Sequence, residues 1–264
     1  MALFKFLREP SMLTSSLLLA LKDSLFIASL LAYILAYYYC QARLEVAFKM
    51  PKLVYLVSSI AIGLASSWVL YKLPYTQNLD VTYLALLHIA FYGIACCLLI
   101  ILVTSNSASF SLYILCYTTT VLEANSLVVF VASYAINQPS NGLIFGLVLG
   151  VGIATSFAYL QYFILSIIKQ PLIPIIGAIV IMSAQLARST NLLAQADIVN
   201  SGKTLWNTSS WIPEENIFGQ IISILVGYES RPTALYLSIF CLSIVCLTSG
   251  YFLLRKYPNE TKRG

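Results

Sequence analysis

The sequence predicts an all-α integral membrane protein of seven transmembrane helices, arranged as two inverted three-helix repeats plus a final helix. Three observations lead to this fold class. The 264 residues are 59% hydrophobic and only 9% charged, whereas soluble domains carry roughly 25% charged residues. Seven apolar runs are long enough to cross a bilayer. Two acidic residues, Asp23 and Glu123, lie one hundred positions apart in two of these runs.

The predicted spans follow from the apolar runs and from the prolines beside them. A proline can open or end a helix without breaking one. Such prolines flank the second and fifth runs, and they are Pro51, Pro74, Pro139 and Pro171. The expected spans, in chain order, are Met12–Tyr39, Leu53–Tyr71, Val81–Val103, Ser109–Ile136, Gly142–Ile168, Pro171–Ala187 and Thr233–Leu254.

We expect one polytopic membrane domain over residues 1–264. Its first repeat is predicted over residues 12–103 and its second over residues 109–187. An outer segment, 188–232, and a last helix, 233–254, follow. Each repeat has an odd number of spans, so the second copy is inverted relative to the first. Transporters built this way bind their substrates at the repeat interface, near the bilayer midplane.

Lysine and arginine in the short loops set the expected orientation, because cytoplasmic loops carry an excess of both residues. If the chain has seven spans, eight lysine and arginine residues fall on the C-terminal side of the membrane and six on the N-terminal side. We therefore expect the N-terminus outside and the C-terminus in the cytoplasm, in a plasma (inner) membrane. The strongest part of this bias is the tail with Arg255, Lys256, Lys262 and Arg263.

The predicted outer segment differs from the rest of the chain. It holds Trp206 and Trp211, which suit a membrane interface. Its apolar run Ile217–Val226 predicts a short amphipathic or re-entrant helix that ends at a glycine cap, Gly227. Its acidic residues either collect cations at a pore mouth or are solvated loop charges, and they include Asp197, Glu214 and Glu215.

Asp23 and Glu123 are the candidate metal-binding residues. At ~1.5 Å per residue, Asp23 lies roughly 15 Å inside a helix that begins near Leu13, close to the middle of a hydrocarbon core about 30 Å thick. An ionisable group at this depth normally faces the protein interior and marks a pathway, a relay or an ion pair. We predict a midplane cation site there, with further oxygen ligands from Thr119, Thr120 and Ser126.

The same two acids have a structural interpretation. Lys22 pairs in that case with Asp23 or Glu123 and holds the first and fourth helices together. Sequence neighbours on a helix point about 100° apart, so Glu123 is the better partner for Lys22. His88, in the third span, is either a ligand or proton relay or a buried hydrogen-bonded side chain.

Three stretches of the chain match known motifs. Lys22–Phe26 (KDSLF) and Leu122–Ser126 (LEANS) each hold an acid at the second position, as an R-E-G-L-E motif does. Leu225–Thr233 (LVGYESRPT) matches a segment of the form L-L-G-Y-x-x-x-P-S before a last span. In these motifs and in span order, from about residue 12 to 254, the chain resembles the oxidase-dependent iron permeases, the high-affinity iron uptake family of bacteria and fungi.

The resemblance implies inward transport of iron or a related metal cation, with metal handed over by an outer oxidase or an iron-binding protein. Iron is then the substrate, and no permanently bound cofactor is expected. The chain also departs from the family. Each motif keeps only its first acid, because the second acid is replaced by Phe26 in one repeat and by Ser126 in the other. Two carboxylates match a highly charged cation less well than four.

Other function classes find little support in the sequence. No Lys/Arg-rich tract indicates a nucleic-acid partner, and no hydrolase, ATPase or haem-attachment motif indicates an enzyme. The six cysteines read as small buried side chains. Two hypotheses remain. The chain is either an iron-permease-like transporter in the lipid bilayer or a transport-inactive subunit of a larger membrane complex.

Overall fold

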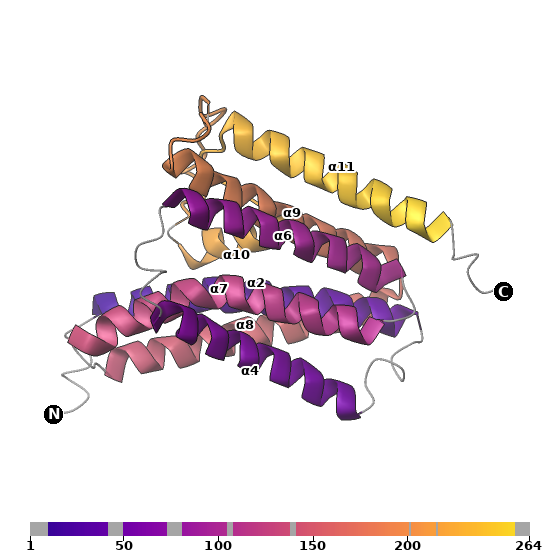
Figure 1. Cartoon of the computed structure of the whole chain (residues 1–264), viewed down its shortest axis with the longest axis horizontal. Coiled ribbons are helices and arrows are strands. Elements are labelled where there is room, and N and C mark those ends of the chain that lie inside the picture. Colours follow the sequence, from indigo (N-terminus) through magenta and orange to yellow (C-terminus); the bar gives the residue numbers. More distant parts are fainter. Residues whose placement is uncertain are drawn as a thin grey trace.

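The computed structural model describes residues 10–41, 50–72, 81–104, 108–137, 141–200, 202–214 and 216–256. These residues form eight α-helices and a single isolated β-bridge between Thr204 and Thr233. In chain order (Figure 1) the helices are α2 (Pro10–Cys40), α4 (Met50–Lys72), α6 (Val81–Thr104), α7 (Ala108–Asn137), α8 (Asn141–Ile168), α9 (Leu172–Gln195), α10 (Ile217–Val226) and α11 (Ala234–Lys256).

Six of these helices are long and apolar enough to cross a membrane, which confirms the predicted class of all-α membrane protein. They are α2, α6, α7, α8, α9 and α11. The seventh expected span corresponds to α4, a 23-residue helix whose described apolar part, Val57–Val69, is shorter than a span. The count of seven therefore stays a prediction.

Two predictions about the segment after the sixth span can be compared with the helices. The short helix α10 and its Gly227 cap, which has a φ of 75°, are confirmed. In contrast, α9 continues to Gln195 and does not end at Ala187. Its polar last turns face the protein: Ser189 and Thr190 are buried, and their hydroxyls donate to carbonyls one turn earlier. Arg188 is consequently a helix residue and not a loop residue.

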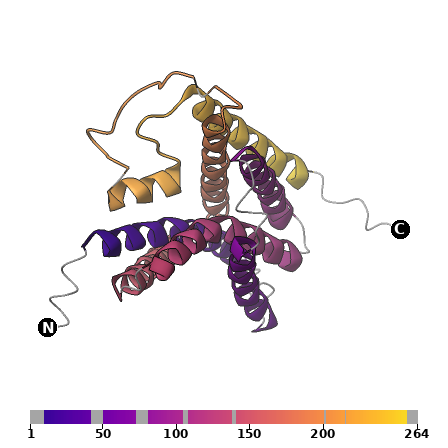
Figure 2. The ribbon, with the colours of Figure 1, turned by 60° about the vertical axis from the view of Figure 1, so that its left-hand side comes forward.

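The helices form two groups with α10 between them. Figure 1 shows α2, α4, α7 and α8 in one group and α6, α9 and α11 in the other. Within and between the groups, α2 packs on α8, α4 on α7, α6 on α7 and α9, and α9 on α2 and α11. The turned view in Figure 2 places α10 beside the first half of α2, and α10 contacts both α2 and α9.

Glycine allows two helix pairs to approach closely. A Cβ on Gly150 of α8 would lie 2.7 Å from the Leu17 carbonyl oxygen and 2.8 Å from the Ala20 Cβ of α2. A Cβ on Gly63 of α4 would lie 2.9 Å from the Thr120 Cβ of α7. All three distances are too short for a real side chain. Small residues at membrane helix crossings allow this kind of backbone contact.

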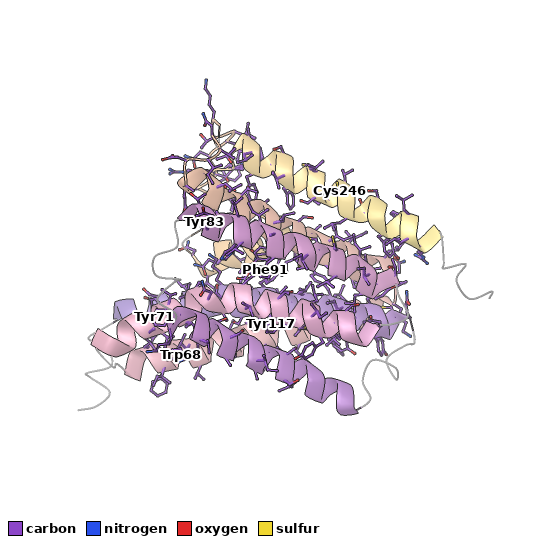
Figure 3. The ribbon with its side chains drawn as sticks, in the orientation of Figure 1. Trp68, Tyr71, Tyr83, Phe91, Tyr117 and Cys246 are labelled. Carbon is purple, nitrogen blue, oxygen red and sulfur yellow. The ribbon has the colours of Figure 1, made fainter. Side chains whose placement is uncertain are left out.

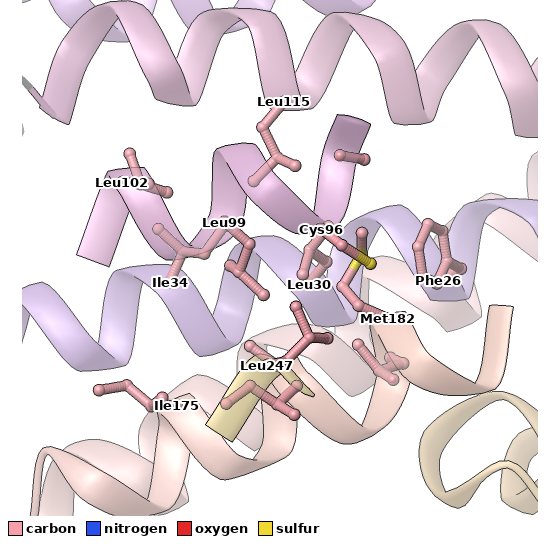
Figure 4. Packing of buried hydrophobic residues seen from close by; sticks show 14 of the residues in the cluster. Phe26, Leu30, Ile34, Cys96, Leu99, Leu102, Leu115, Ile175, Met182 and Leu247 are labelled. Carbon is pink, nitrogen blue, oxygen red and sulfur yellow. The ribbon is translucent and has the colours of Figure 1, made fainter. Parts of the chain in front are cut away.

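A buried apolar cluster lies between the two groups and fixes the helices that carry the candidate site. Figure 4 shows its members at close range, among them Phe26 of α2, Leu115 of α7 and Met182 of α9. Phe26, Leu115 and Met182 are fully buried. Because cores of this kind are close-packed, the polar side chains beside the cluster are held in defined positions.

The outer face of the bundle is apolar. Figure 3 shows side chains along the helices that point away from the core, with Tyr83 and Phe91 of α6 and Trp68 of α4 among those labelled. At the end of α4 the ammonium of Lys72 lies 5.7 Å from the centre of the Trp68 ring. Exposed apolar side chains between aromatic and basic end residues are typical of a lipid-facing surface.

Candidate functional site

Asp23 and Glu123 come together inside the bundle, from α2 and α7. Their side chains are only 3% and 8% exposed. The charge of Glu123 acts on Asp23, and the Ser126 hydroxyl connects Asp23 to the backbone of α7, because its Oγ donates to Asp23 Oδ2 and also lies 2.9 Å from the main-chain carbonyl oxygen of Glu123. The hydroxyl has a single proton, so it serves one of these acceptors at a time. The two acids predicted from the sequence thus belong to one cluster.

The carboxyl group of Glu123 has its hydrogen-bond donor on α6. The Tyr92 hydroxyl donates to Glu123 Oε1, and both side chains are buried. The Tyr92 ring packs edge-on against Phe26 at 6.4 Å between ring centres, and His88 lies at 6.4 Å on α6 itself. Three helices, α2, α6 and α7, therefore contribute to the site.

The resemblance expects a second acid near Asp23, and the structure places a packed aromatic side chain at that position. Phe26 stands where the resemblance expects a carboxylate, and it is fully buried against Tyr92. At the other position where the resemblance expects a carboxylate, Ser126 provides the hydroxyl that bonds Asp23. Of these two positions, one thus holds an aromatic packing residue and the other a hydrogen-bond donor.

The other predicted helpers do not contact the acids. The Thr119 hydroxyl donates to the Leu115 carbonyl at 2.8 Å, and the Thr120 hydroxyl donates to the Cys116 carbonyl at 2.6 Å. Both are bonded within their own helix, a common arrangement for threonine in membrane helices. Only Ser126, of the three expected helpers, reaches a site carboxylate.

Lys22 does not form the ion pair considered from the sequence. Its side chain is exposed, and within the described residues it lies within ion-pair distance of neither Asp23 nor Glu123. Its charge nevertheless acts on both acids from farther away. The two carboxylates are accordingly held by hydroxyl groups and not by a salt bridge.

As a metal-binding group, the cluster provides oxygen atoms only. Across the part of the chain that the structure describes, no group of three or more His, Cys, Asp and Glu side chains is assembled. The site has two carboxylates, Asp23 and Glu123, and two hydroxyls, Ser126 and Tyr92. Oxygen donors of this kind suit hard cations such as Mg²⁺, Ca²⁺ and Mn²⁺ and the harder forms of iron.

A second polar cluster, the Arg188 cluster, lies where α9, α10 and α11 meet, and consists of Arg188, Asn191, Glu229 and Tyr236. Arg188 Nη2 donates to the Ser223 carbonyl of α10. Asn191 Nδ2 donates to Glu229 Oε1 at 3.5 Å. The Tyr236 hydroxyl donates to the Gly227 carbonyl at 2.9 Å. These three hydrogen bonds therefore involve the C-terminal end of α10 or the loop that follows it.

Two atoms of the Arg188 cluster lack partners. Arg188 Nε and Glu229 Oε2 are buried, and neither has a hydrogen bond to the described residues. Burial raises the pKa of Glu229, the charge of Glu214 adds to this increase, and the Arg188 charge and the Asn191 bond oppose it. The charge of Arg188 acts on Glu123 as well as on Glu229.

The sequence interpretation missed Tyr92 and the role of Arg188. Tyr92 follows His88 by one helical turn in a uniformly apolar span, and only the histidine was singled out there. Arg188 falls in the predicted outer segment, because the sixth span is expected to end at Ala187. Residues 188–191 are Arg, Ser, Thr and Asn, with no proline or glycine among them. The absence of a helix-breaking residue was the available signal that the helix continues past Ala187.

Comparison with known proteins identifies no relative: no family model matches the chain, and no similar curated protein or solved structure was found.

Proposed function

We propose that this chain transports a metal cation across a membrane through the Asp23–Glu123 pair. The observation that carries the proposal is that two buried acids belong to one cluster, each carboxylate bonded by a hydroxyl group, and that neither forms an ion pair with a described residue. Buried acids normally pair with a base or bind a metal. Two carboxylates in one low-dielectric place repel each other unless a proton or a cation lies between them.

The depth of the pair supports a transport site. Asp23 lies ten residues after the start of its span at Leu13, and Glu123 lies twelve residues after the start of its span at Ser111. At ~1.5 Å per residue these positions are roughly 15 and 18 Å deep, near the middle of a bilayer. Transporters place substrate sites at this depth because both sides can reach them in turn.

An inverted repeat is part of the proposal, and the helix contacts support it. The two predicted repeats pair α2 with α7, α4 with α8 and α6 with α9. If the members of each pair are exchanged, the set of contacts among these six helices stays the same. The α2–α8 contact becomes α7–α4, and the α6–α7 contact becomes α9–α2. The α2–α7 and α6–α9 contacts are each converted into themselves. A bundle without internal symmetry has no reason to follow this rule.

The close glycine contacts follow the same register. Gly150 of α8 approaches the Leu17 carbonyl and Ala20 of α2. Gly63 of α4 approaches the Tyr117 carbonyl and Thr120 of α7. Positions 17 and 117, and 20 and 120, have the offset of one hundred that relates Asp23 to Glu123. Three pairs with one offset support a relation between the two halves more strongly than the similarity of their residues does.

A divalent cation matches this site best. Two carboxylates supply two negative charges, so a divalent ion leaves the cluster neutral, whereas a trivalent ion leaves a buried positive charge. The two hydroxyls and water molecules would complete the oxygen shell. The resemblance to iron permeases makes ferrous iron the first ion to test. The proposed role is binding and passage of the ion, not catalysis.

The proposed orientation places the α10 end outside and the end of α11 in the cytoplasm of a plasma (inner) membrane. The excess of Lys and Arg on the α11 side supports it. An outer oxidase or iron-binding protein, which the resemblance implies, would deliver the ion at the α10 end. Figure 1 shows the connections around α10 at the same end of the bundle as the start of α2.

One observation favours a second candidate function, a transport-inactive subunit of a membrane complex. Phe26 fills the place of a family carboxylate and is fully buried in the core. A chain that kept the fold and lost transport would no longer need that acid. In this alternative the Asp23–Ser126 bond serves only to hold α2 against α7.

The two candidates are separated by uptake of radioactive Fe²⁺ into proteoliposomes, under anaerobic conditions. We expect uptake by the wild-type protein above empty vesicles, and its loss in Asp23→Asn and Glu123→Gln. Both variants keep the side-chain shape and remove the charge. Asp197→Asn is the matched control, because Asp197 is an exposed acid of the α9–α10 connection and its loss should leave uptake unchanged. Wild-type protein without uptake, or Glu123→Gln with normal uptake, would contradict the transporter proposal.

A further inference from the structure

The helix α10 is held at one end by groups from two neighbouring helices. It has ten residues, so it is roughly 15 Å long and cannot span a bilayer. At its C-terminal end the Ser223 carbonyl accepts from Gly227 N–H at 3.0 Å and from Arg188. The Gly227 carbonyl accepts from Tyr236 of α11 at 2.9 Å. A guanidinium at a helix C-terminus is also favoured by the helix dipole.

Arg188 is a partly buried charge without an ion pair. No carboxylate lies within salt-bridge distance of it in the described residues, and its Nε has no hydrogen-bond partner there. Buried charges are normally paired, because an unpaired charge inside a protein is costly. The charge of the guanidinium acts on both Glu123 and Glu229, and Glu229 Oε2 is also buried without a hydrogen-bond partner among the described residues.

The surroundings of Arg188 favour movement toward Glu229. Arg188 and Asn191 are three residues apart on α9, so they share one helix face. Asn191 holds Glu229 through Oε1 and leaves Oε2 available. The loop between α10 and α11 begins at Gly227, whose left-handed φ of 75° suits a glycine and marks a point where the chain changes direction.

We propose that Arg188 is a positioning residue that couples occupancy of the Asp23–Glu123 pair to the position of α10. With the pair empty, its negative charge attracts the guanidinium. A bound divalent cation removes that attraction and repels the guanidinium toward Glu229, and the bond to Ser223 transmits the movement to α10. The inference rests on the proposed cation site. The cation supplies the differential interaction that any shift between two arrangements requires.

The test measures the accessibility of α10 in detergent-solubilised protein. Phe218, on α10, is 65% exposed, and Phe218→Cys provides a labelling site for a maleimide. The exposed cysteines Cys97, Cys241 and Cys246 are replaced by serine in the same background. Labelling rates are compared with and without Fe²⁺ under anaerobic conditions, and binding of Fe²⁺ is followed separately by the shift in melting temperature.

We expect Fe²⁺ to change the labelling rate roughly fivefold or more, the lower end of typical coupling between sites. Arg188→Gln should abolish this change while the melting-temperature shift with Fe²⁺ remains, and Arg188→Lys should restore part of it. Arg231→Gln is the matched control. It removes the same charge from an exposed residue of the α10–α11 loop, so its response should equal that of the parent.

Each outcome separates the coupling from the site itself. A parent protein with no melting-temperature shift in Fe²⁺ contradicts the proposed function and, with it, the coupling. A parent that binds Fe²⁺ without a change in labelling contradicts the coupling alone. An unchanged response in Arg188→Gln overturns the role of Arg188. If Arg188→Gln does not fold, Glu229→Gln replaces it, and the coupling is overturned if its labelling response is undiminished.

Discussion

The two polar clusters inside this bundle solve the problem of buried charge in opposite ways. The Asp23–Glu123 pair brings like charges together and gives each carboxylate a hydroxyl donor, from Ser126 and Tyr92. The Arg188 cluster brings opposite charges near each other and leaves Arg188 Nε and Glu229 Oε2 without hydrogen-bond partners among the described residues. The first cluster therefore has hydrogen bonds but no opposite charge, whereas the second has opposite charges but incomplete hydrogen bonding. A mobile cation that completes the first cluster would explain its missing positive charge.

The largest effect is expected where the first cluster meets the core. Phe26→Ala removes a fully buried ring that packs on Tyr92. Loss of such a side chain typically costs about 3–5 kcal/mol. It should also free Tyr92 to leave Glu123, so cation binding should weaken as well. Thermal unfolding in detergent checks the first effect. A loss of stability below ~1 kcal/mol would show that Phe26 is not part of the packed core.

A smaller effect is expected from the hydroxyl of Tyr92. Tyr92→Phe keeps the ring and leaves Glu123 Oε1 without its donor. An unsatisfied buried acceptor costs about 1–3 kcal/mol. Bound Fe²⁺ should recover part of that loss, because the cation replaces the missing donor. The measurement is the melting temperature with and without Fe²⁺, and an equal loss in both conditions would contradict a cation at Glu123.

Lys22 tests whether the Asp23–Glu123 pair is stable without a basic partner, as the comparison of the two clusters implies. Lys22 is exposed and unpaired within the described part of the chain. Its replacement, Lys22→Met, should therefore act independently of Glu123→Gln. The stability effects of the two changes should add to within about 0.5 kcal/mol in the double variant. Recovery of stability by the double variant would instead restore the ion-pair interpretation.

The smallest effect concerns the Arg188 cluster and pH. Burial raises the pKa of Glu229 above its ordinary value of 4.5, so the folded protein favours the protonated carboxyl. This group's contribution is most favourable below pH 4.5 and is lost as the pH rises through the higher folded-state pKa. Glu229→Gln should remove that loss. Because Glu229 is only partly buried, the change should stay within about 1 kcal/mol. Unfolding followed from acidic to neutral pH checks it, and curves of equal slope would contradict it.

The sequence was informative wherever one local property decided the structure. Apolar run length predicted the membrane helices, and Gly227 predicted the end of α10. The two acids could be selected because charge is rare in an apolar span. Ser126 could be chosen as a helper because it lies one turn after Glu123 on the same helix.

The missed features depend on contacts between helices that are distant in the sequence. The bond from Tyr92 to Glu123 crosses from α6 to α7, and nothing in an apolar span marks which tyrosine will make it. The exposure of Lys22 depends on which face of α2 the neighbouring helices leave uncovered. The helical state of Arg188 depends on buried hydroxyl bonds of Ser189 and Thr190, which hydropathy alone does not register.

Direct binding of Fe²⁺ to the purified protein tests the central claim most closely. Titration calorimetry under anaerobic conditions compares wild type, Glu123→Gln and Asp197→Asn. We predict saturable binding of a single ion per chain by wild type and Asp197→Asn, and at least roughly tenfold weaker binding by Glu123→Gln, since a lost carboxylate ligand removes one charge of the pair. Equal binding by wild type and Glu123→Gln, with both proteins folded, would contradict a cation site at the Asp23–Glu123 pair.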